Sequence, residues 1–230
     1  MTAQLNPRGD VAVLVLAAGS GVRLGAGVPK ALRPLAGEPL LVHAVRRVAE
    51  AASVRSIVVA APPDGVETVR RLLAPVAPVA VVAGGVERQH SVAAALAAVP
   101  DDVEIVLVHD AARALAPPDM VESVAAAVRG GRPAVIPVLP VVDTVKEVGP
   151  DGVVLGTVDR SALRIVQTPQ GFRRAVLAAA HAGAADPLTD DAGLVEKAGV
   201  PVSCVPGSEL ALKITLPADL VIAEALLRVP

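Results

Sequence analysis

The chain has 230 residues, which is enough for one large domain or two small ones with a substantial core. Hydrophobic residues make up 53% of it and charged residues 19%, which excludes a disordered segment. The net charge of −2 argues against a nucleic-acid binder, and the single cysteine excludes an internal disulfide. Phe172 is the only aromatic residue, so bases cannot be stacked on a platform of aromatic rings.

The mean hydropathy of +0.59 raises the question of a membrane span. The apolar runs, such as Val11–Ala18 and Ile57–Ala61, are short and are broken by Gly, Pro or charge. None approaches the roughly 18 residues that a spanning helix needs. The first residues, MTAQLNPRGD, lack the pattern of a signal peptide. We therefore expect a cytoplasmic protein that binds neither membranes nor nucleic acid.

Up to about residue 139, predicted strands alternate with predicted helices. The strands are Val11–Leu16, Val54–Ala60, Val79–Val82, Val103–Val108 and Ala134–Leu139, and the helices are Pro39–Ala51, Asp64–Leu73, Glu87–Val99 and Pro117–Val128. Alternation of this kind implies βαβ units. The fold class that we expect is α/β, with a Rossmann-like, mostly parallel sheet covered by helices on both faces.

The alternation stops near Pro140. The segments Val141–Val148 and Val153–Val158 are polar on alternate residues and flank Pro150-Asp151-Gly152, a strong turn signal. No predicted helix covers them, so we predict a β-hairpin arm over about residues 140–160 that projects from the domain. The remaining predictions are a strand at Leu163–Gln167, a helix from Phe172, a short helix from about Asp190, strands at Val202–Val205 and Leu212–Thr215, and a closing helix from Pro217. Without a repeat or a linker, residues 1–230 are predicted to form one domain.

The segment AAGSGVRLGAGVPK, residues 17–30, directly follows the first strand, where ligands bind in open α/β sheets. Its glycines allow backbone N–H groups to approach phosphate oxygens, and Arg23 and Lys30 add positive charge. A Walker loop is excluded because Pro29 and Ala31 flank the lysine, and a dinucleotide fingerprint is excluded because Leu24 replaces a glycine. The segment predicts a phosphate-binding loop; the alternative is a flexible surface loop.

Two further segments follow predicted strands at the same sheet edge. Gly84-Gly85 and Ser91 join a strand to a helix and offer N–H groups and a hydroxyl to a base or ribose, although a plain glycine turn is the alternative. In His109-Asp110-Ala111-Ala112-Arg113, the carboxylate could hold a metal ion or a substrate hydroxyl, and the arginine could anchor it or meet a phosphate. The histidine is expected to pack under the rim of the sheet.

Other polar residues are each compatible with more than one role. Thr144 lies on the outgoing strand of the hairpin, Arg160 follows its return strand, and Thr168 lies in a polar turn before a predicted helix. Asp190-Asp191 could simply cap the next helix. Lys213 lies in an apolar stretch, where it is equally compatible with a solvent-facing and a functional position.

Taken together, the motifs resemble one family. AAGSGVRLGAGVPKA, AGGVERQHSV, LVHDAARAL, DTVK, GTVDRSAL, QTPQGF, TDDAGLVE and LALKIT occur in the order found in the 2-C-methyl-D-erythritol 4-phosphate cytidylyltransferases, from about residue 11 to the end. The first motif alone indicates nucleotidyltransferases in general. HDAAR, TVDR and QTPQ narrow the resemblance to this subgroup. Val86, where some relatives carry Asp, is a departure.

The resemblance implies transfer of CMP from CTP to methylerythritol phosphate with Mg²⁺, in the non-mevalonate route to isoprenoids. Arg23 and Lys30 would stabilise the transition state, and Arg160 and Lys213 would hold the acceptor phosphate. The cytidine and triphosphate would lie against Ala17, Ala18, Gly19, Ser20, Gly21, Gly84, Gly85 and Ser91, and the acceptor against Asp110, Ala111, Arg113, Thr144 and Thr168. Asp110 is a possible metal ligand, with Mg²⁺ held mainly by the triphosphate. A homodimer that exchanges arms is implied, so that Thr144 and Arg160 act in the neighbouring site.

The chemistry is compatible with this set of residues. A phosphate monoester has a second pKa of about 6, so it is largely a dianion near neutral pH and needs no general base. It does need relief from repulsion as it approaches a triphosphate, which cations and in-line positioning supply. The alternatives are a cytidylyltransferase for another polyol phosphate such as ribitol 5-phosphate, a non-catalytic nucleotide-binding regulator and, as the weakest, a dehydrogenase.

Overall fold

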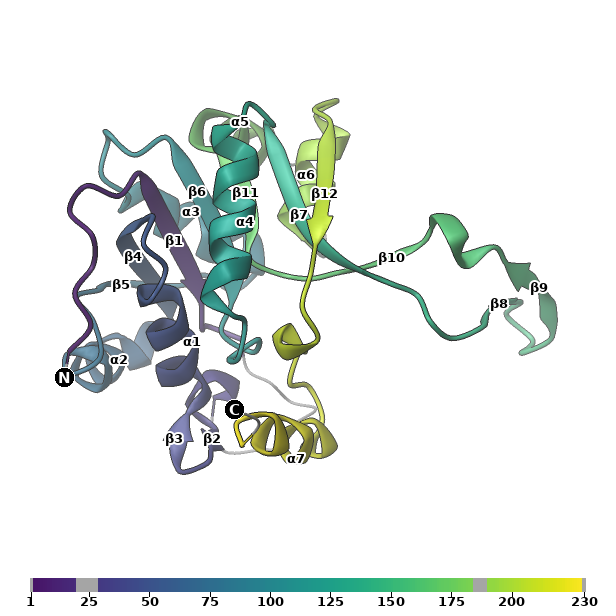
Figure 1. The fold of residues 1–230 in the computed structure, drawn as a ribbon, viewed down its shortest axis with the longest axis horizontal. Helices are drawn as coiled ribbons and strands as arrows, with labels where there is room; N and C mark the ends of the chain where they lie inside the picture. Colours follow the sequence, from purple (N-terminus) through teal and green to yellow (C-terminus); the bar gives the residue numbers. More distant parts are fainter. Residues whose placement is uncertain (1, 20–28, 184–189, 229–230) are drawn as a thin grey trace.

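A computed structural model describes residues 2–19, 29–183 and 190–228. Among these residues, a sheet of eight strands has the order β10-β7-β11-β6-β1-β4-β5, and β12 pairs with β7 (Figure 1). Its strands are β1 Val11–Leu16, β4 Val54–Ala61, β5 Ala80–Ala83, β6 Ile105–Asp110, β7 Ala134–Pro140, β10 Arg164–Val166, β11 Gln170–Arg173 and β12 Val202–Pro206. The helices are α1 Leu40–Ala49, α2 Val66–Leu73, α3 Arg88–Ala97, α4 Pro118–Arg129, α5 Arg174–Ala182, α6 Asp191–Lys197 and α7 Pro217–Leu226. Short 3-10 turns are η2 Lys30–Leu32, η3 Pro63–Gly65, η4 Arg160–Ala162 and η5 Glu209–Ala211.

The central strands confirm the predicted parallel arrangement. β1 pairs in parallel with both β4 and β6, and β4 pairs in parallel with β5. In this register Leu16, at the end of β1, lies opposite Asp110, at the end of β6. The carboxyl ends of the two strands therefore bring the loop after β1 and the HDAAR segment to one edge of the sheet.

Two separate hydrophobic clusters lie on the two faces of the sheet. Alternate residues of β1 divide between them: Val13 belongs to the cluster that includes the buried faces of α1, α2 and α4, and Leu14 to the one that includes α3, α5 and α6. Both side chains are fully buried. In Figure 1, α4 lies in front of the sheet and α5 behind it. The expectation of a sheet covered on both faces is thus confirmed.

Two predictions about the second half of the chain are wrong. The helix expected from Phe172 begins at Arg174, because residues 170–173 form β11, which runs antiparallel between β6 and β7. In this strand the side chain of Phe172 is fully buried in the interior of the sheet. The strand expected at Leu212–Thr215 is absent from the described structure, because this stretch packs Ile214 beneath α7 instead of joining the sheet.

The hairpin arm is formed by β8 Val145–Val148 and β9 Val154–Val158, which pair only with each other in the described structure. Figure 1 shows the arm projecting far from the sheet. Residues 141–144, which were expected to belong to the first strand of the hairpin, form its stem instead. At the tip, Gly152 has a φ of +80°, a conformation that glycine adopts without strain.

A small substructure closes the lower end of the molecule in Figure 1. The strands β2 Pro34–Leu35 and β3 Glu38–Pro39 pair with each other, and Leu35 packs in one cluster with Ile214 and with Ala223 of α7. The segment that carries Lys213 leads into α7, so this packing fixes the path of that segment near the edge of the sheet. Among the described residues, no helix has the length and apolar character that crossing a membrane would require.

Candidate active site

A cavity of about 350 Å³ opens at the carboxyl ends of β1 and β6. Its volume is in the range of sites that bind small ligands. The predicted site residues that line it are Ala17, Ala18, Gly19, Lys30, Gly85, Ser91, Asp110, Ala111 and Lys213. Residues from five separate segments of the sequence therefore meet in one place.

The turn after β5 forms one wall of this first cavity. The N–H of Gly85 donates to Ser91 Oγ at 3.1 Å, which holds the glycine turn against the start of α3. A Cβ atom on Gly84 would lie 2.6 Å from the Cβ of Ala18 and 2.9 Å from Ser91 Oγ. Only glycine therefore allows this turn to approach the loop after β1 so closely, which explains the Gly84-Gly85 pair better than a plain turn does.

A second cavity, of about 400 Å³, adjoins the first. Arg113 and Thr168 line it, and three residues line both cavities: Arg88, Asp110 and Lys213. Two neighbouring hollows with shared charged residues between them could hold two ligands side by side, with their reacting groups near the shared residues.

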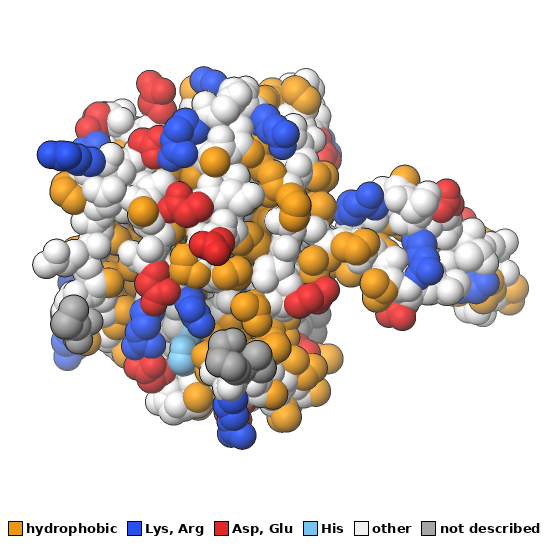
Figure 2. Space-filling model, viewed as in Figure 1, with side chains coloured by type: hydrophobic (Ala, Val, Ile, Leu, Met, Phe, Trp, Pro, Cys, Tyr) orange, Lys and Arg blue, Asp and Glu red, His pale blue; other side chains and the backbone are white. Residues whose placement is uncertain are grey.

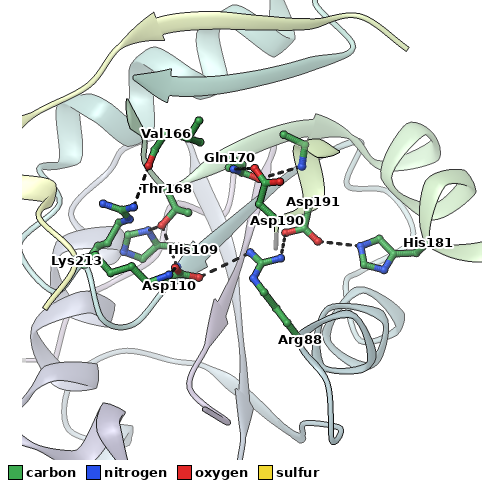
Figure 3. Close-up of polar contacts among 12 residues, drawn as sticks. Arg88, His109, Asp110, Val166, Thr168, Gln170, His181, Asp190, Asp191 and Lys213 are labelled. Atoms are coloured by element: carbon green, nitrogen blue, oxygen red, sulfur yellow. Dashed lines mark hydrogen bonds and ion pairs between the residues drawn. The ribbon is translucent and has the colours of Figure 1, made fainter. Parts of the chain in front are cut away.

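Asp110 is held between two cations at this boundary (Figure 3). Its Oδ2 lies 2.7 Å from Lys213 Nζ, and its Oδ1 lies 3.7 Å from Arg88 Nη2. Burial acts to raise the pKa of Asp110, but the positive charges of Lys213 and Arg88 outweigh it and lower the pKa to about 2. Asp110 is therefore an anion at any pH near neutrality.

The backbone and side chain of the HDAAR segment are tied to the turn before β11. Thr168 Oγ1 accepts a hydrogen bond from the N–H of Asp110 at 3.0 Å and lies 3.1 Å from His109 Nδ1. His109 is fully buried, and burial lowers its pKa to about 4, so its imidazole is neutral near pH 7. The expectation that this histidine packs beneath the rim of the sheet is confirmed.

Arg113 lies at the floor of the second cavity and is buried. Its Nη1 donates to the carbonyl of Ala211 at 2.7 Å and its Nη2 to the carbonyl of Val166 at 3.0 Å. Burial lowers the pKa of Arg113, while Asp110 acts against this effect. The sequence predicts that this guanidinium anchors Asp110 or meets a phosphate; in the structure its hydrogen bonds tie η5 to β10, which shapes the cavity.

Some predicted site residues lie elsewhere. Thr144 and Arg160 are exposed on the arm and line neither cavity of this chain. Ser20, Gly21 and Arg23 fall outside the described residues. The convergence of four cations that the sequence predicts thus reduces, within the described part of one chain, to Lys30 and Lys213 in a common cavity.

Three polar residues that meet at the site carry no predicted catalytic or binding role, although Asp191 is expected as a possible helix cap. Arg88 lines both cavities, Asp191 is fully buried and pairs with it, and His181 contacts Asp191 (Figure 3). Asp190 caps α6 as expected, since its side chain accepts from the N–H of Gly193. A buried partner for Arg88 could not be predicted, because α3 and α6 are brought together only by the fold.

Of the carboxylates that the structure describes, Asp110 is the one that lines both cavities and could contact a divalent cation there. Among the described residues, no group of three or more His, Cys, Asp or Glu side chains is arranged to hold a metal ion. Asp110 lies between both cavities, but its two oxygens already face Lys213 and Arg88. This donor set fits an ion bound mainly through the oxygens of a phosphorylated ligand, with Asp110 as at most one protein ligand.

Comparison with known proteins gives one consistent result. A model of the family described as 2-C-methyl-D-erythritol 4-phosphate cytidylyltransferase matches residues 11–229. A protein of that name from Frankia casuarinae is 59% identical over 96% of this chain and 82% of its own length, and one from Saccharopolyspora erythraea is 58% identical over 95% and 99%. The crystal structure of the Thermus thermophilus protein of the same name superposes with a TM-score of 0.77 at 36% identity, covering 94% of this chain and 98% of that one.

Proposed function

The chain belongs to the 2-C-methyl-D-erythritol 4-phosphate cytidylyltransferase family, and from this membership we propose that it transfers CMP from CTP to 2-C-methyl-D-erythritol 4-phosphate. An oxygen of the acceptor phosphate attacks the α-phosphorus of CTP. The bond from that phosphorus to the oxygen bridging to the β-phosphate breaks, and pyrophosphate leaves. The products are CDP-methylerythritol and pyrophosphate, and residues 1–230 act as one nucleotidyltransferase domain.

The observation that carries this proposal is the pair of adjoining cavities with Asp110 and Lys213 between them. The first cavity takes CTP, with the cytidine against Ala18 and the glycine turn and the phosphates near Lys30. The second takes the acceptor, whose phosphate Lys213 reaches from the boundary. The two anions therefore meet where positive side chains reduce their repulsion.

The absence of aromatic rings from this cavity is compatible with binding a base. In the turn after β5, the N–H groups of Gly84 and Gly85 already donate to the carbonyl of Ala61 and to Ser91 Oγ, so other backbone groups of the cavity wall would contact the base. Specificity for cytosine over adenine would come from such polar groups in a pocket of fixed width. Val86 lines the cavity, its side chain is fully exposed, and it replaces the Asp of some relatives. In this chain, any contact of residue 86 with the nucleotide would therefore come from its backbone.

Asp110 has a different task from the cations. Because it is ionised near neutral pH and faces the second cavity, it can accept hydrogen bonds from the hydroxyl groups of the acceptor. A group held at a pKa of about 2 is a poor general base. The acceptor phosphate needs none, since its second pKa of about 6 makes it largely a dianion at pH 7.

Mg²⁺ is proposed as the divalent cation, bound mainly by the triphosphate. When bound, it would neutralise part of the charge of the triphosphate and of the departing pyrophosphate. Asp110 is the residue of this chain that could add a ligand from the boundary between the cavities. The use of CTP also supports the expected cytoplasmic location.

A homodimer with exchanged arms is part of the proposal. Five aliphatic side chains of the arm are more than half exposed, and Figure 2 shows hydrophobic groups along it: Val142, Val148, Val153, Val154 and Leu155. Apolar groups on a projecting arm indicate that another surface covers them. A second copy of the chain would cover them and bring Thr144 and Arg160 of each arm to the acceptor cavity of the neighbour.

A pyrophosphate-release assay tests the proposed reaction. The purified protein is given CTP or ATP, each with methylerythritol phosphate or ribitol 5-phosphate. We expect release with CTP and methylerythritol phosphate, and little with the other three combinations. Ribitol 5-phosphate is disfavoured because the compared proteins all bear the name of the methylerythritol phosphate enzyme. Equal or faster release with ribitol 5-phosphate would contradict the proposed acceptor.

A further inference from the structure

Arg88 has no part in the reaction described above, although it lies at the centre of the site. It is the first residue of α3, it lines both cavities, and a quarter of its side chain is exposed. The other two residues that line both cavities, Asp110 and Lys213, are assigned to the acceptor. A charged side chain in such a position requires an explanation, because its partial burial is costly unless its partners are well placed.

The guanidinium of Arg88 bridges two carboxylates on different elements. Its Nη1 donates to Asp191 Oδ2 at 2.5 Å, while its Nη2 lies 3.7 Å from Asp110 Oδ1. Asp191 and Asp110 raise the pKa of Arg88, against the lowering effect of burial. The planar fork of an arginine suits this bridge, because it presents donors in fixed directions on two sides.

The Asp191 end of this bridge is rigid. Asp191 is fully buried, and its second oxygen accepts a hydrogen bond from His181 Nε2 at 2.9 Å. The side chain of His181 is only 6% exposed and lines neither cavity. A neighbouring contact holds the start of α6 as well, since Gln170 Oε1 accepts from the N–H of Ala192 at 3.1 Å.

The Asp110 end of the bridge lies in the active site, where the second cation is less constrained. Lys213 is 47% exposed, carries its charge on a flexible stem, and also has to reach the acceptor phosphate. Arg88 cannot follow the substrate in this way, because Asp191 holds its other side. Of the two cations that face Asp110, only Arg88 is therefore fixed by the interior of the protein.

We propose that Arg88 is a positioning residue that holds the Asp110 carboxylate in the orientation that receives the hydroxyl groups of the acceptor. Asp191, itself held by His181, keeps Arg88 in place. This inference rests on the proposed function of the second cavity and extends it to residues that touch no substrate. The chain of contacts runs from α5 through α6 and α3 to the end of β6 (Figure 3).

Replacing Arg88 with lysine tests the bridge while keeping its charge. The lysine side chain is shorter overall and ends in a single ammonium group, which cannot face both carboxylates, so Asp110 loses its fixed partner. We expect R88K to raise the KM for methylerythritol phosphate by a factor on the order of 10, with the KM for CTP nearly unchanged. Because Arg88 acts through Asp110, the double variant R88K/D110N should be no worse than D110N alone.

Two substitutions of His181 test the distant end. Gln can place an amide N–H near the position of Nε2, whereas Leu has no donor. We expect His181→Leu to raise the KM for the acceptor several-fold, whereas the KM of His181→Gln should stay close to the wild-type value. Arg174→Gln is the matched control on the same helix, since Arg174 bonds to the carbonyl of Pro100 and lines neither cavity. It should lower the melting temperature without changing either KM.

A purely structural role for the bridge predicts a different result. It would lower the melting temperature in all variants, without selective loss of acceptor binding and without rescue by Gln. Equal changes in both KM values for R88K, or additive effects in R88K/D110N, would overturn the proposal. If His181→Leu does not fold, the R88K comparison decides alone. A wild-type protein that releases no pyrophosphate would contradict the proposed function instead.

Discussion

Lys213 Nζ and Asp110 Oδ2 lie 2.7 Å apart and join the segment before α7 to the end of β6. The pair lies at the boundary between the two cavities, so each side chain faces the space where the two substrates are proposed to meet. Asp110 is kept ionised by this contact and by Arg88, and Lys213 is kept near the site by Asp110 until a phosphate competes for it.

On the acid side, the pH dependence of kcat/KM for the acceptor should be set by the second pKa of the acceptor phosphate. Since the pKa of Asp110 is about 2, this carboxylate does not titrate between pH 5 and 9. The acceptor phosphate does titrate, with a second pKa of about 6. We expect kcat/KM for the acceptor to fall below about pH 6, and a phosphonate acceptor, whose second pKa is higher, to move this limb to higher pH. An acid limb that stays in place with the phosphonate would show that a group of the enzyme is responsible.

Acidification should destabilise the protein through His109. The pKa of His109 is lowered by burial from 6.5 to about 4, so between these values the unfolded chain binds more protons than the folded one. Stability is therefore greatest above pH 6.5 and falls by up to roughly 3 kcal/mol as the pH drops to 4. Urea unfolding at several pH values measures how the free energy of unfolding changes with pH. In this window, His109→Asn should reduce the number of protons taken up on unfolding by about one. An unchanged slope would mean that His109 is not held neutral.

Lys30 should affect turnover more than folding. We expect Lys30→Ala to lower kcat by a factor on the order of 10² or more, because a positive charge near the triphosphate is lost. The melting temperature should change little. Lys197→Ala is the matched control, since Lys197 is exposed at the end of α6 and lines neither cavity. Normal turnover by purified Lys30→Ala would refute the proposed role.

Arm exchange can be tested by mixing two inactive variants. A Lys30→Ala dimer lacks the lysine in both sites, and an Arg160→Ala dimer lacks the arginine in both. If each arm serves the neighbouring site, a mixed dimer has one site with both residues intact. Random reassortment of subunits should then restore about a quarter of the wild-type activity.

The control for this experiment is each variant denatured and refolded alone. Neither should gain activity. Failure of the mixture to gain activity, when size measurements show that subunits have exchanged, would place Arg160 in the site of its own chain or outside the site altogether.

Gly84 should be intolerant of even a methyl group. Its added Cβ would lie 2.6 Å from Ala18 Cβ, so Gly84→Ala must push apart the two walls of the first cavity. We expect a loss of about 1–3 kcal/mol in unfolding free energy and a higher KM for CTP. Gly65→Ala is the control, because a Cβ there meets only Pro62 at an ordinary 3.6 Å and should change stability by less than about 1 kcal/mol. Unchanged CTP binding by Gly84→Ala would contradict the placement of the nucleotide.

Several elements could be predicted from local pattern because their periodicity is strong. β1 and α4 occur where alternation of apolar segments and turn residues indicates them. β11 could not be found in this way, because Gln170–Arg173 is short, contains a glycine and continues directly into α5. Its pairing with β6 and β7 stabilises it, and strands that are distant in sequence supply this pairing.

The candidate site likewise contains some residues that the sequence predicts and others that it does not. The phosphate-binding loop and the residues Asp110 and Lys213 could be proposed from motifs, since glycines and charges next to strand ends have a direct chemical meaning. Arg88, Asp191 and His181 could not. Each belongs to a different helix, and a buried ion pair between helices depends on how both pack against the sheet.

By itself, then, the order of residues determined the α/β class, the edge of the sheet that carries the chemistry and the family to which the chain belongs. Such features depend on local propensity and on short motifs, which can be recognised without knowing the tertiary contacts of the segment. Only the tertiary structure decided that Lys213 pairs with Asp110 and that Asp191 and His181 support Arg88 from the interior. Contacts of this kind arise when distant segments are packed together, and their partners leave no mark on neighbouring positions in the sequence.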